Sequence, residues 1–407
     1  MTTVASNRAF NAALFTEATR NRNFTNLMTE GAPKKAKGGK GTSAQTSSHM
    51  PVVRVTDLTK TAGNEVEVDI VHQLSASPTM GDRKLEGRGE SMTTASMDMK
   101  IDQGRHLVNA GGKMAQQRTK HKLEGIARTL LSDNYFSRLT DETTLYHLAG
   151  ARGSLLDSDM IVPLASHDEF SEIVVNPLAP PTYDRHYFAN DEAGLDALDS
   201  SDVFSLGDVE RVRLGIDEMP SMRMQPIKYK DDVLADEDPL YVQYLTPRQF
   251  YDFKQTTSHK DLQTLMSNAM RRTSGFRHPL FMGDCFLWEG ILIKKMPGKF
   301  IEFAAGHVVD VSTNTNNAQT TTVAPNVKVH RSIVLGGQAL AHAFGNSGTV
   351  DGPDAGFIGM TKENTDHDNS TEISIRWMDG KKKIRFADKN GRVNDHGVIV
   401  LDTAVSG

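Results

Sequence analysis

The order of apolar and polar residues along the chain predicts strands near both ends and helices in the middle. Apolar and polar side chains alternate over residues 52–58 and 66–71, as in half-buried strands, and residues 97–107 are strand-like as well. Residues 75–96, between the last two of these segments, are polar and rich in glycine. Two strands that flank such a stretch predict an extended two-stranded arm, which cannot stabilise itself in water and needs a neighbouring surface.

Four helices are expected in the central part of the chain. The strongest pattern covers residues 113–148, where Leu123, Ala127 and Leu131 belong to an apolar stripe with helical spacing. The second helix, at residues 205–219, and the third, from Thr246-Pro247 through Phe253, begin with residues typical of a helix N-terminus. We place the fourth at residues 262–272.

Further strands are expected late in the chain, at residues 241–245, 290–294, 333–335, 371–378, 382–386 and 397–401. Residues 337–344 are predicted to form a short helix. Residues 151–204, which contain several prolines, aromatic and acidic side chains, are interpreted as an inserted surface loop. Strands grouped early and late around central helices indicate a mixed α+β class.

Composition narrows the class of protein. A chain of 407 residues has enough material for two or three domains. It has no run of about 18 apolar residues, as a membrane helix would need, and no apolar signal segment at its start, which favours folding in a cytosol. The single cysteine, Cys285, lies among large apolar residues and is interpreted as a buried hydrophobe.

Charge is distributed unevenly between the start of the chain and the rest. Residues 1–50 hold seven basic side chains and two acidic ones, a net charge of +5, so the remainder carries −10 of the total of −5. Residues 8–20 could form a short amphipathic helix, and residues 29–50 have the composition of a linker. A basic tail on an acidic body suggests a polyanionic or acidic partner, although a solvated linker would have the same composition.

No arrangement of residues for catalysis or metal binding is apparent. The fourteen histidines form neither an H-E-x-x-H motif nor a helix with two histidines one turn apart. The densest cluster, Asp366-His367-Asp368, lies in a polar stretch typical of an exposed loop. The sequence also lacks a nucleophile elbow and a phosphate-binding loop. We therefore expect no catalytic residues, no metal site and no cofactor.

Several segments resemble the major capsid family of N-four-type tailed bacteriophages, in the same order along residues 50–404. They are Val53-Arg-Val-Thr-Asp-Leu-Thr-Lys-Thr-Ala-Gly63, Met80-Gly-Asp-Arg-Lys-Leu-Glu-Gly87, Ile101-Asp-Gln-Gly-Arg-His-Leu107, Leu245-Thr-Pro247, His278-Pro-Leu-Phe-Met-Gly283, Arg331-Ser-Ile-Val-Leu-Gly-Gly-Gln-Ala339, Gly380-Lys-Lys-Lys383 and Asp395-His-Gly-Val-Ile-Val400. Single segments are weak signals, but this many in one order are hard to obtain by chance.

The resemblance implies an α+β Hong Kong 97-type tailed-phage major capsid fold. Residues 1–50 would be the N-terminal arm, 51–110 the extended loop with its base strands, 111–225 the peripheral domain with its spine helix, 226–330 the axial domain, and 331–407 the C-terminal part of the peripheral domain. The spine helix is expected at residues 113–148, and residues 205–219 could be part of it.

The function implied is self-assembly into pentamers and hexamers that form an icosahedral head around double-stranded DNA. A scaffold, a portal and a decoration protein are further expected partners, and a membrane is not. Expected contacts between subunits lie in the extended loop, at Met80, Arg83, Lys84, Glu86, Arg88 and Glu90. The arm residues expected to contact either packaged DNA or an acidic neighbouring subunit are Arg20, Arg22, Lys34, Lys35, Lys37 and Lys40.

Two other classes stay open on the sequence. A bacterial nanocompartment shell protein shares the fold and encloses enzymes, and a soluble oligomeric enzyme is a more distant alternative. The first alternative predicts particles that hold a cargo protein without DNA. The second predicts a small defined oligomer with a deep pocket lined by convergent polar groups.

Overall fold

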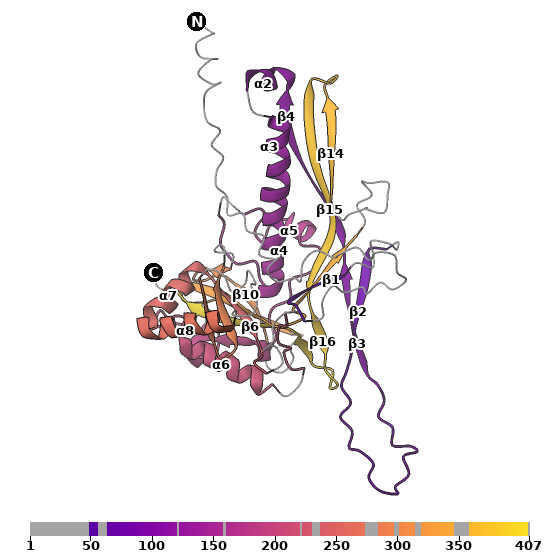
Figure 1. Ribbon diagram of the computed structural model, residues 1–407, viewed down its shortest axis with the longest axis vertical. Coiled ribbons are helices and arrows are strands. Elements are labelled where there is room, and N and C mark those ends of the chain that lie inside the picture. The colour runs from indigo at the N-terminus through magenta and orange to yellow at the C-terminus, as the bar shows by residue number, and fades with distance from the viewer. Residues whose placement is uncertain are drawn as a thin grey trace.

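The computed structural model describes ten stretches of the chain. They are residues 49–55, 63–119, 122–157, 160–219, 222–229, 237–272, 284–296, 301–313, 319–345 and 358–405. The expected helix at residues 8–20 and the basic residues of the arm lie outside these stretches. Figure 1 shows a body of helices and strands from which one long hairpin extends at one end and a narrow sheet with a long helix at the other.

The body is built around a seven-stranded sheet with the order β5-β18-β12-β6-β8-β7, and with β9 paired to β12. Its strands are β5 (His186–Phe188), β6 (Tyr241–Leu245), β7 (Cys285–Trp288), β8 (Ile291–Lys295), β9 (Glu302–Phe303), β12 (Val329–Leu335) and β18 (Val398–Ala404). All residues of β6, β12 and β18 are buried. A central strand that is buried on both faces needs a cover on each side of the sheet.

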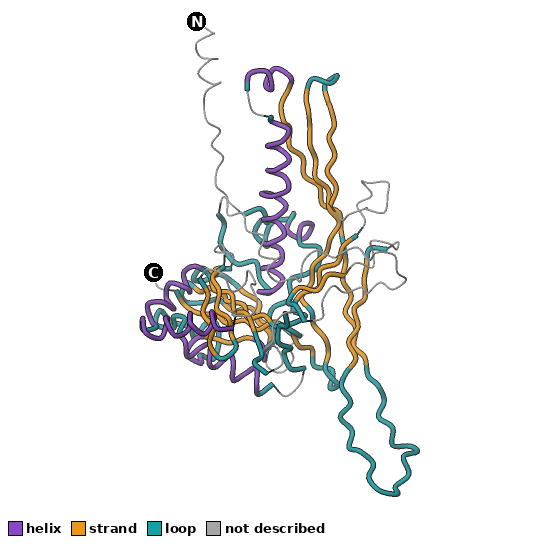
Figure 2. Tube along the Cα trace, viewed as in Figure 1, coloured by secondary structure: helices purple, strands orange, loops and turns teal. Residues whose placement is uncertain are grey.

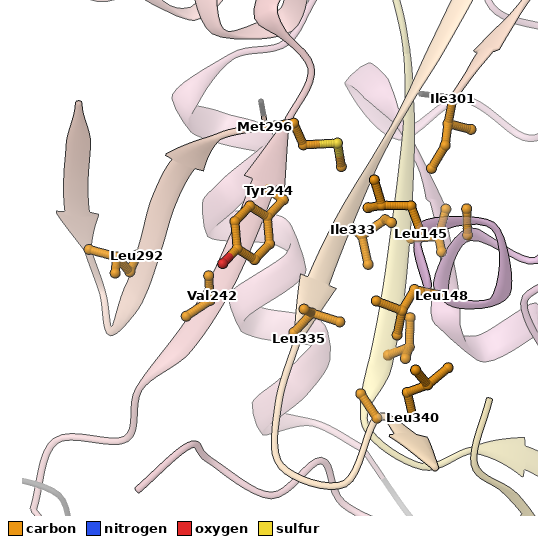
Figure 3. Close-up of a cluster of buried hydrophobic side chains, with 14 of the residues drawn as sticks. Leu145, Leu148, Val242, Tyr244, Leu292, Met296, Ile301, Ile333, Leu335 and Leu340 are labelled. Carbon is orange, nitrogen blue, oxygen red and sulfur yellow. The ribbon is translucent and has the colours of Figure 1, made fainter. Parts of the chain in front are cut away.

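Alternate residues of these strands enter two different cores. Val334 and Ile399 face the helices α6 (Leu206–Asp217), α7 (Pro247–Thr256) and α8 (His259–Arg272), which cover one side of the sheet. Ile333 and Val400 face the other side, where Leu145 and other residues from the end of α4 (Ser137–Ala149) complete the core. Figure 3 shows Leu145 and Leu148 beside Ile333 in this second core. The sheet is therefore sandwiched between helices.

A long helix leads from the narrow sheet into the body. It consists of α3 (Leu123–Thr129), a π-helical segment η3 (Leu130–Phe136) and α4. Every residue from Leu139 to Ala149 is buried, so the second half of the helix is enclosed by protein. The helix ends at Gly150, which has a φ of 69°, and a side chain there would collide with the Ala179 carbonyl oxygen.

The narrow sheet, which we call the wing, consists of β4 (Asp102–Gly112), β14 (Ile358–Thr365) and the paired part of β15 (Ser370–Lys383). The same sheet continues into the body through β13 (Leu340–Phe344) and β1 (Val52–Val55). Ile373, Ile375 and Trp377 of β15 pack with Leu131 of the long helix. The short helix α2 (Lys113–Arg118) lies at the far end of the wing (Figure 1).

The extended hairpin points away from the wing. Its strands β2 (Glu65–Val71) and β3 (Thr94–Lys100) pair in antiparallel register, as the alternation in the sequence predicts. Between them, residues 72–93 form a long open loop without helix or strand, drawn in teal in Figure 2, which we call the extended loop. Two short strand pairs complete the fold, β10 (Val309–Ser312) with β11 (Thr320–Val323) and β16 (Arg385–Ala387) with β17 (Val393–Asp395).

Several predicted elements are confirmed and others are wrong. The capping pair Ser205 and Asp208 starts α6, and Thr246 caps α7. The helix expected at residues 113–148 is divided, because the backbone is extended at Thr119 and Lys122 and the long helix begins only at Leu123. Residues 97–107 belong to two strands, β3 and β4, that meet at Ile101.

The helix predicted at residues 337–344 is wrong, because β13 occupies this segment. Its five residues are all buried between β1 and β15, and strand pairing on both sides overrides the helical propensity of the alanines. Residues 151–204 are not a surface loop either. Val162 and Val174 pack against the long helix, and Leu195 and Phe204 enter the two cores of the body.

One buried ion pair joins the sheet of the body to the long helix. Arg331 of β12 donates two hydrogen bonds to the Asp402 carboxylate of β18, each of 2.7 Å, and a third of 2.9 Å to the carbonyl oxygen of Ala149 at the end of α4. Its guanidinium stacks over the Phe303 ring at 4.8 Å. His186 also donates to Asp402, at 2.7 Å. Arg331 and Asp402 are both 0% exposed, so each charge depends on the other.

Removal of the negative charge should therefore be costly. The change Asp402→Asn keeps the shape of the side chain but leaves the Arg331 guanidinium buried without a counter-charge, and we expect the free energy of unfolding to fall by about 3–5 kcal/mol. Denaturant titration of the purified chain would measure this. The control is Asp368→Asn, which breaks a solvent-exposed pair with Lys113 and should leave the stability close to the original value.

Candidate assembly surfaces

The extended loop carries large apolar side chains that are exposed in the described part of the chain. Leu74, Met80, Leu85 and Met92 are each 70–71% exposed. Single exposed apolar side chains are ordinary on a protein surface, but four large ones on one otherwise polar loop favour a surface that contacts another molecule. The loop therefore has the character of a surface that is covered only when another molecule is present.

Five of the six loop residues expected to contact a neighbour are exposed, namely Met80, Arg83, Lys84, Glu86 and Arg88. Glu86 and Gly87 form a turn that is closed by the hydrogen bond from the Arg88 amide to the Leu85 carbonyl, of 3.1 Å. Gly87 has a φ of 80°, a conformation that few residues other than glycine adopt. The turn presents the Glu86 carboxylate at its tip.

Glu90 instead holds the base of the loop together within one chain. Its carboxylate accepts hydrogen bonds from the amides of Ser75, at 2.9 Å, and Ala76, at 2.7 Å, and from Lys389 Nζ, at 3.0 Å. The bonds from Ala76, Ser75 and Lys389 lower the pKa of the Glu90 carboxyl to about 2. Lys389 lies in the turn between β16 and β17 and also donates to Ser75 Oγ, so this cluster fixes the loop to the body.

A second polar cluster lies buried where the wing joins the body. His342 of β13 donates to the Asp379 carboxylate at 2.8 Å, and Lys381 Nζ lies 3.3 Å from the same carboxylate and donates to Thr143 of α4. Burial lowers the pKa of His147 to about 3, and Lys381 adds to this effect. Burial also lowers the pKa of His342 to about 4, despite the hydrogen bond to Asp379. Both histidines are therefore neutral at pH 7.

The described residues form no arrangement typical of an active site. The cluster Asp366-His367-Asp368 is the turn between β14 and β15, and its residues are exposed. No group of His, Cys, Asp or Glu side chains able to hold a metal ion occurs in the described part of the chain. Within the same residues, no helix has the length and apolar character needed to cross a membrane. Cys285 is buried, as expected, and burial raises the pKa of its thiol.

Comparison with solved structures defines the fold. The chain superimposes on the capsid of Ralstonia phage GP4 with a TM-score of 0.75 and 22% identity, over 98% of this chain and 95% of that chain. It is similar to the cyanophage Pam1 capsid (TM-score 0.61, 18% identity, 98% and 96% covered) and to the head of Helicobacter pylori bacteriophage KHP40 (0.57, 12%, 96% and 96%). The fold is therefore the Hong Kong 97-type capsid fold, as the sequence resemblance implies.

A family model narrows this class further. The chain belongs to the phage capsid protein family, whose model matches residues 3–407. No curated protein matches the chain. It is a phage major capsid protein that assembles with copies of itself into the shell of the virion head, and it is a structural protein rather than an enzyme. The interpretation as a capsid subunit is thus confirmed over the nanocompartment shell and the soluble enzyme.

The Glu90 cluster makes a prediction about the mobility of the extended loop. The change Lys389→Ala removes the charge that links the loop to the β16–β17 turn, and we expect the amides of Ser75 and Ala76 to exchange their hydrogens about three- to tenfold faster. Hydrogen exchange read by mass spectrometry on the unassembled chain would measure this. Lys362→Ala, which breaks an exposed pair between strand β14 of the wing and Glu124 of the long helix, is the matched control and should not change exchange in the loop.

The buried histidines predict a loss of stability in acid. Burial lowers the pKa of His396 to about 4, and both of its ring nitrogens lack a hydrogen-bond partner in the described structure. The folded-state pKa lies below the ordinary value of 6.5, so protons favour the unfolded state, and stability present above pH 6.5 is lost as the pH falls towards 4.

The change His396→Phe keeps an aromatic ring against Phe386 and removes the titrating group. It should abolish up to about 3 kcal/mol of the decrease in unfolding free energy between pH 6.5 and pH 4. Denaturant titrations at several pH values would measure the decrease. His367→Asn in the exposed wing turn is the control and should leave the pH dependence unchanged. An identical pH profile for His396→Phe would contradict the assignment.

Proposed function

We propose that the chain forms pentamers and hexamers that close into an icosahedral head around the double-stranded DNA genome. The observation that carries the proposal is the shape of the subunit. The extended loop and the wing protrude in opposite directions from one body. Both carry large apolar side chains that are exposed in the single subunit. In a closed assembly with heterologous contacts, each subunit binds one neighbour through one surface and the next neighbour through a different surface. Both protruding parts of every subunit are then in contact at the same time. Many weak contacts then act together on one shell.

On this proposal the domains correspond to the following residue ranges. Residues 51–110 provide the extended loop and its base strands, residues 111–225 and 331–407 the peripheral domain, and residues 226–330 the axial domain that faces the centre of the capsomer. Four strands of the seven-stranded sheet, β6, β7, β8 and β9, lie in the axial range, whereas β5, β18 and most of β12 lie outside it. The peripheral domain then contains the spine helix, formed by α3, η3 and α4, and the wing strands β14 and β15, while the wing strand β4 belongs mostly to the residues of the extended loop and its base.

The six loop residues, including Glu90, keep their proposed role at the contact between subunits. Met80, Arg83, Lys84, Glu86 and Arg88 are proposed to touch the neighbour directly. Glu90, whose carboxylate is bound to Lys389 and the loop backbone, sets the direction in which the loop leaves the body. Alternating charge along the loop fixes the register between neighbours more than it adds affinity.

The N-terminal arm, with Arg20, Arg22, Lys34, Lys35, Lys37 and Lys40, is proposed to bind acidic surfaces of the next subunit. Its net charge is +5 and the rest of the chain carries −10, which supports attraction between copies. Non-specific contact with packaged DNA is the second candidate, and it would be strongly salt-dependent. A scaffold, a portal and a decoration protein are proposed as further partners, and the subfamily proposed is that of the N-four-type phages.

Electron microscopy of the purified chain, expressed alone and with the phage scaffold, tests the proposal. We expect closed shells with pentamers and hexamers, or isolated rings of five or six subunits, and a matching sedimentation coefficient. Loop deletion offers the control, because a chain in which residues 78–88 are replaced by a short glycine linker should fold but form no closed shell. A monodisperse dimer or tetramer that persists with scaffold present would contradict the proposal.

A further inference from the structure

A small cavity lies where the wing joins the body, between the long helix and β15. Its volume is about 30 Å³. One wall is formed by α4, which contributes Thr140, Thr143 and His147, three residues at the spacing of one helix face. The opposite wall is formed by residues 377–381 of β15. The remaining lining residues are Phe136, Leu139, Ile173 and Val175.

The lining of this cavity is polar on both walls. Two hydroxyl groups and an imidazole come from α4, and Asp379 and Lys381 of β15 add a largely buried carboxylate and ammonium group. Cavities that stay empty in proteins are lined by apolar side chains, whereas a polar cavity that is large enough for a water normally contains one. The lining therefore favours a polar occupant.

Thr140 gives a second, independent indication of such an occupant. The residue is 6% exposed, and its Oγ1 is buried without a hydrogen-bond partner in the described structure. Buried hydroxyl groups are nearly always hydrogen-bonded, because an unpaired one destabilises the fold. Thr143, on the same face of α4, donates its hydroxyl to the Leu139 carbonyl oxygen at 2.7 Å. A partner in the cavity would give Thr140 the hydrogen bond that its neighbour already has.

Two other lining residues can bind the same occupant. Lys381 Nζ donates to Thr143 Oγ1 at 2.6 Å and lies 3.3 Å from the Asp379 carboxylate. An ammonium group has three donors, so one more bond from Lys381 is possible. Burial keeps the His147 ring neutral at pH 7, and its pKa owes nothing to a hydrogen bond. A neutral imidazole has one donor and one acceptor, so His147 can bind a partner of either kind.

Charge and size decide what the occupant is. The positive charge of Lys381 and the negative charge of Asp379 compensate each other, and His147 is neutral, so the lining favours neither an anion nor a cation. A water needs about 10–15 Å³ of such a volume, and the cavity of about 30 Å³ has room for about two. Water also acts as donor and acceptor at once, as the mixed lining requires.

We infer that this cavity is an internal hydration site that holds one or two ordered waters. The waters bridge the Thr140 hydroxyl of α4 to the Lys381 ammonium group of β15, and His147 binds them from the side. They extend the buried cluster of His342, Asp379 and Lys381, so that the root of the wing is joined to the long helix partly through water. A bridging water is nearly as favourable in enthalpy as a direct hydrogen bond. The inference goes beyond the proposed function and does not depend on it.

Two threonines of α4 form a matched pair for the test. Thr144 is 0% exposed and its Oγ1 also lacks a partner in the described structure, but Thr144 does not line the cavity. Thr140→Val keeps the shape of the side chain and removes its bond to water, so we expect the equilibrium constant of unfolding to rise about two- to tenfold. Thr144→Val only replaces an unpaired hydroxyl by a methyl group and should leave this constant unchanged or lower it. Denaturant titration of the purified chain measures both effects.

A high-resolution density map of the purified protein gives a direct readout. The unchanged protein should show density within hydrogen-bond distance of Thr140 Oγ1 and Lys381 Nζ, and Thr140→Val should weaken or remove it. Crystals exposed to xenon, which binds empty apolar cavities, should show no xenon at this position.

Three results would overturn the inference. The first is equal effects of Thr140→Val and Thr144→Val on unfolding, which would mean that the Thr140 hydroxyl has no partner in the cavity. The second is a cavity that shows no density or takes up xenon. The third is density that scatters as an ion rather than as water. If Thr140→Val does not fold, the map of the unchanged protein alone decides between these outcomes.

Discussion

The geometry of the subunit depends on the buried pair between Arg331 and Asp402. The pair joins β12 and β18 in the centre of the body sheet, and through the Ala149 carbonyl it also holds the end of the long helix. Burial alone would raise the pKa of the Asp402 carboxyl, but Arg331 and His186 together outweigh burial and lower the pKa to about 2. Such a pair adds little net stability compared with apolar residues, because two charges lose their water, but it tolerates only one arrangement of its partners. Its contribution is to specify how the helix meets the sheet.

That junction matters because the two protruding parts are attached to different sides of it. The wing packs along α3 and η3, so its direction follows the long helix. The extended hairpin packs through Met97 and Met99 on a small core that includes Ala341 of β13 and Phe386 of β16. The connection between the two sheets is short and tight, since a side chain at Gly336 would collide with the Gln225 carbonyl oxygen. The direction of the extended hairpin relative to the wing is therefore set by this junction.

The sequence predicts local structure well where local chemistry decides it. Ser205 with Asp208 and Thr246 with Gln249 form capping boxes that need no distant partner, and the period-two alternation of β2 is visible in the sequence. The prediction fails where distant pairing decides. An alanine-rich segment becomes β13 only because β1 and β15 bind both of its edges. The opposed charges of the wing cannot be seen in the sequence, since Arg105 and Arg376 become neighbours only through the strand register. The sequence alone does not distinguish Glu90 from its exposed neighbours, because its partner Lys389 is far away along the chain and only the fold brings the two together.

The interior of the body is apolar and the surface of the wing is polar, and this difference favours an assembly in which a wrongly placed subunit can dissociate again. The two cores of the body are apolar and closed, whereas the face of the wing that points away from the long helix carries Arg105, Arg376, Glu363 and Glu372 and one exposed leucine, Leu107. An apolar wing would bind any exposed apolar segment and would release it slowly. Charged side chains contribute little affinity to a misplaced partner but penalise a shift in register, because a shift brings like charges together. Weak contacts of this kind can open and re-form until the shell closes. The closed shell is then stable because all of these weak contacts are formed at the same time.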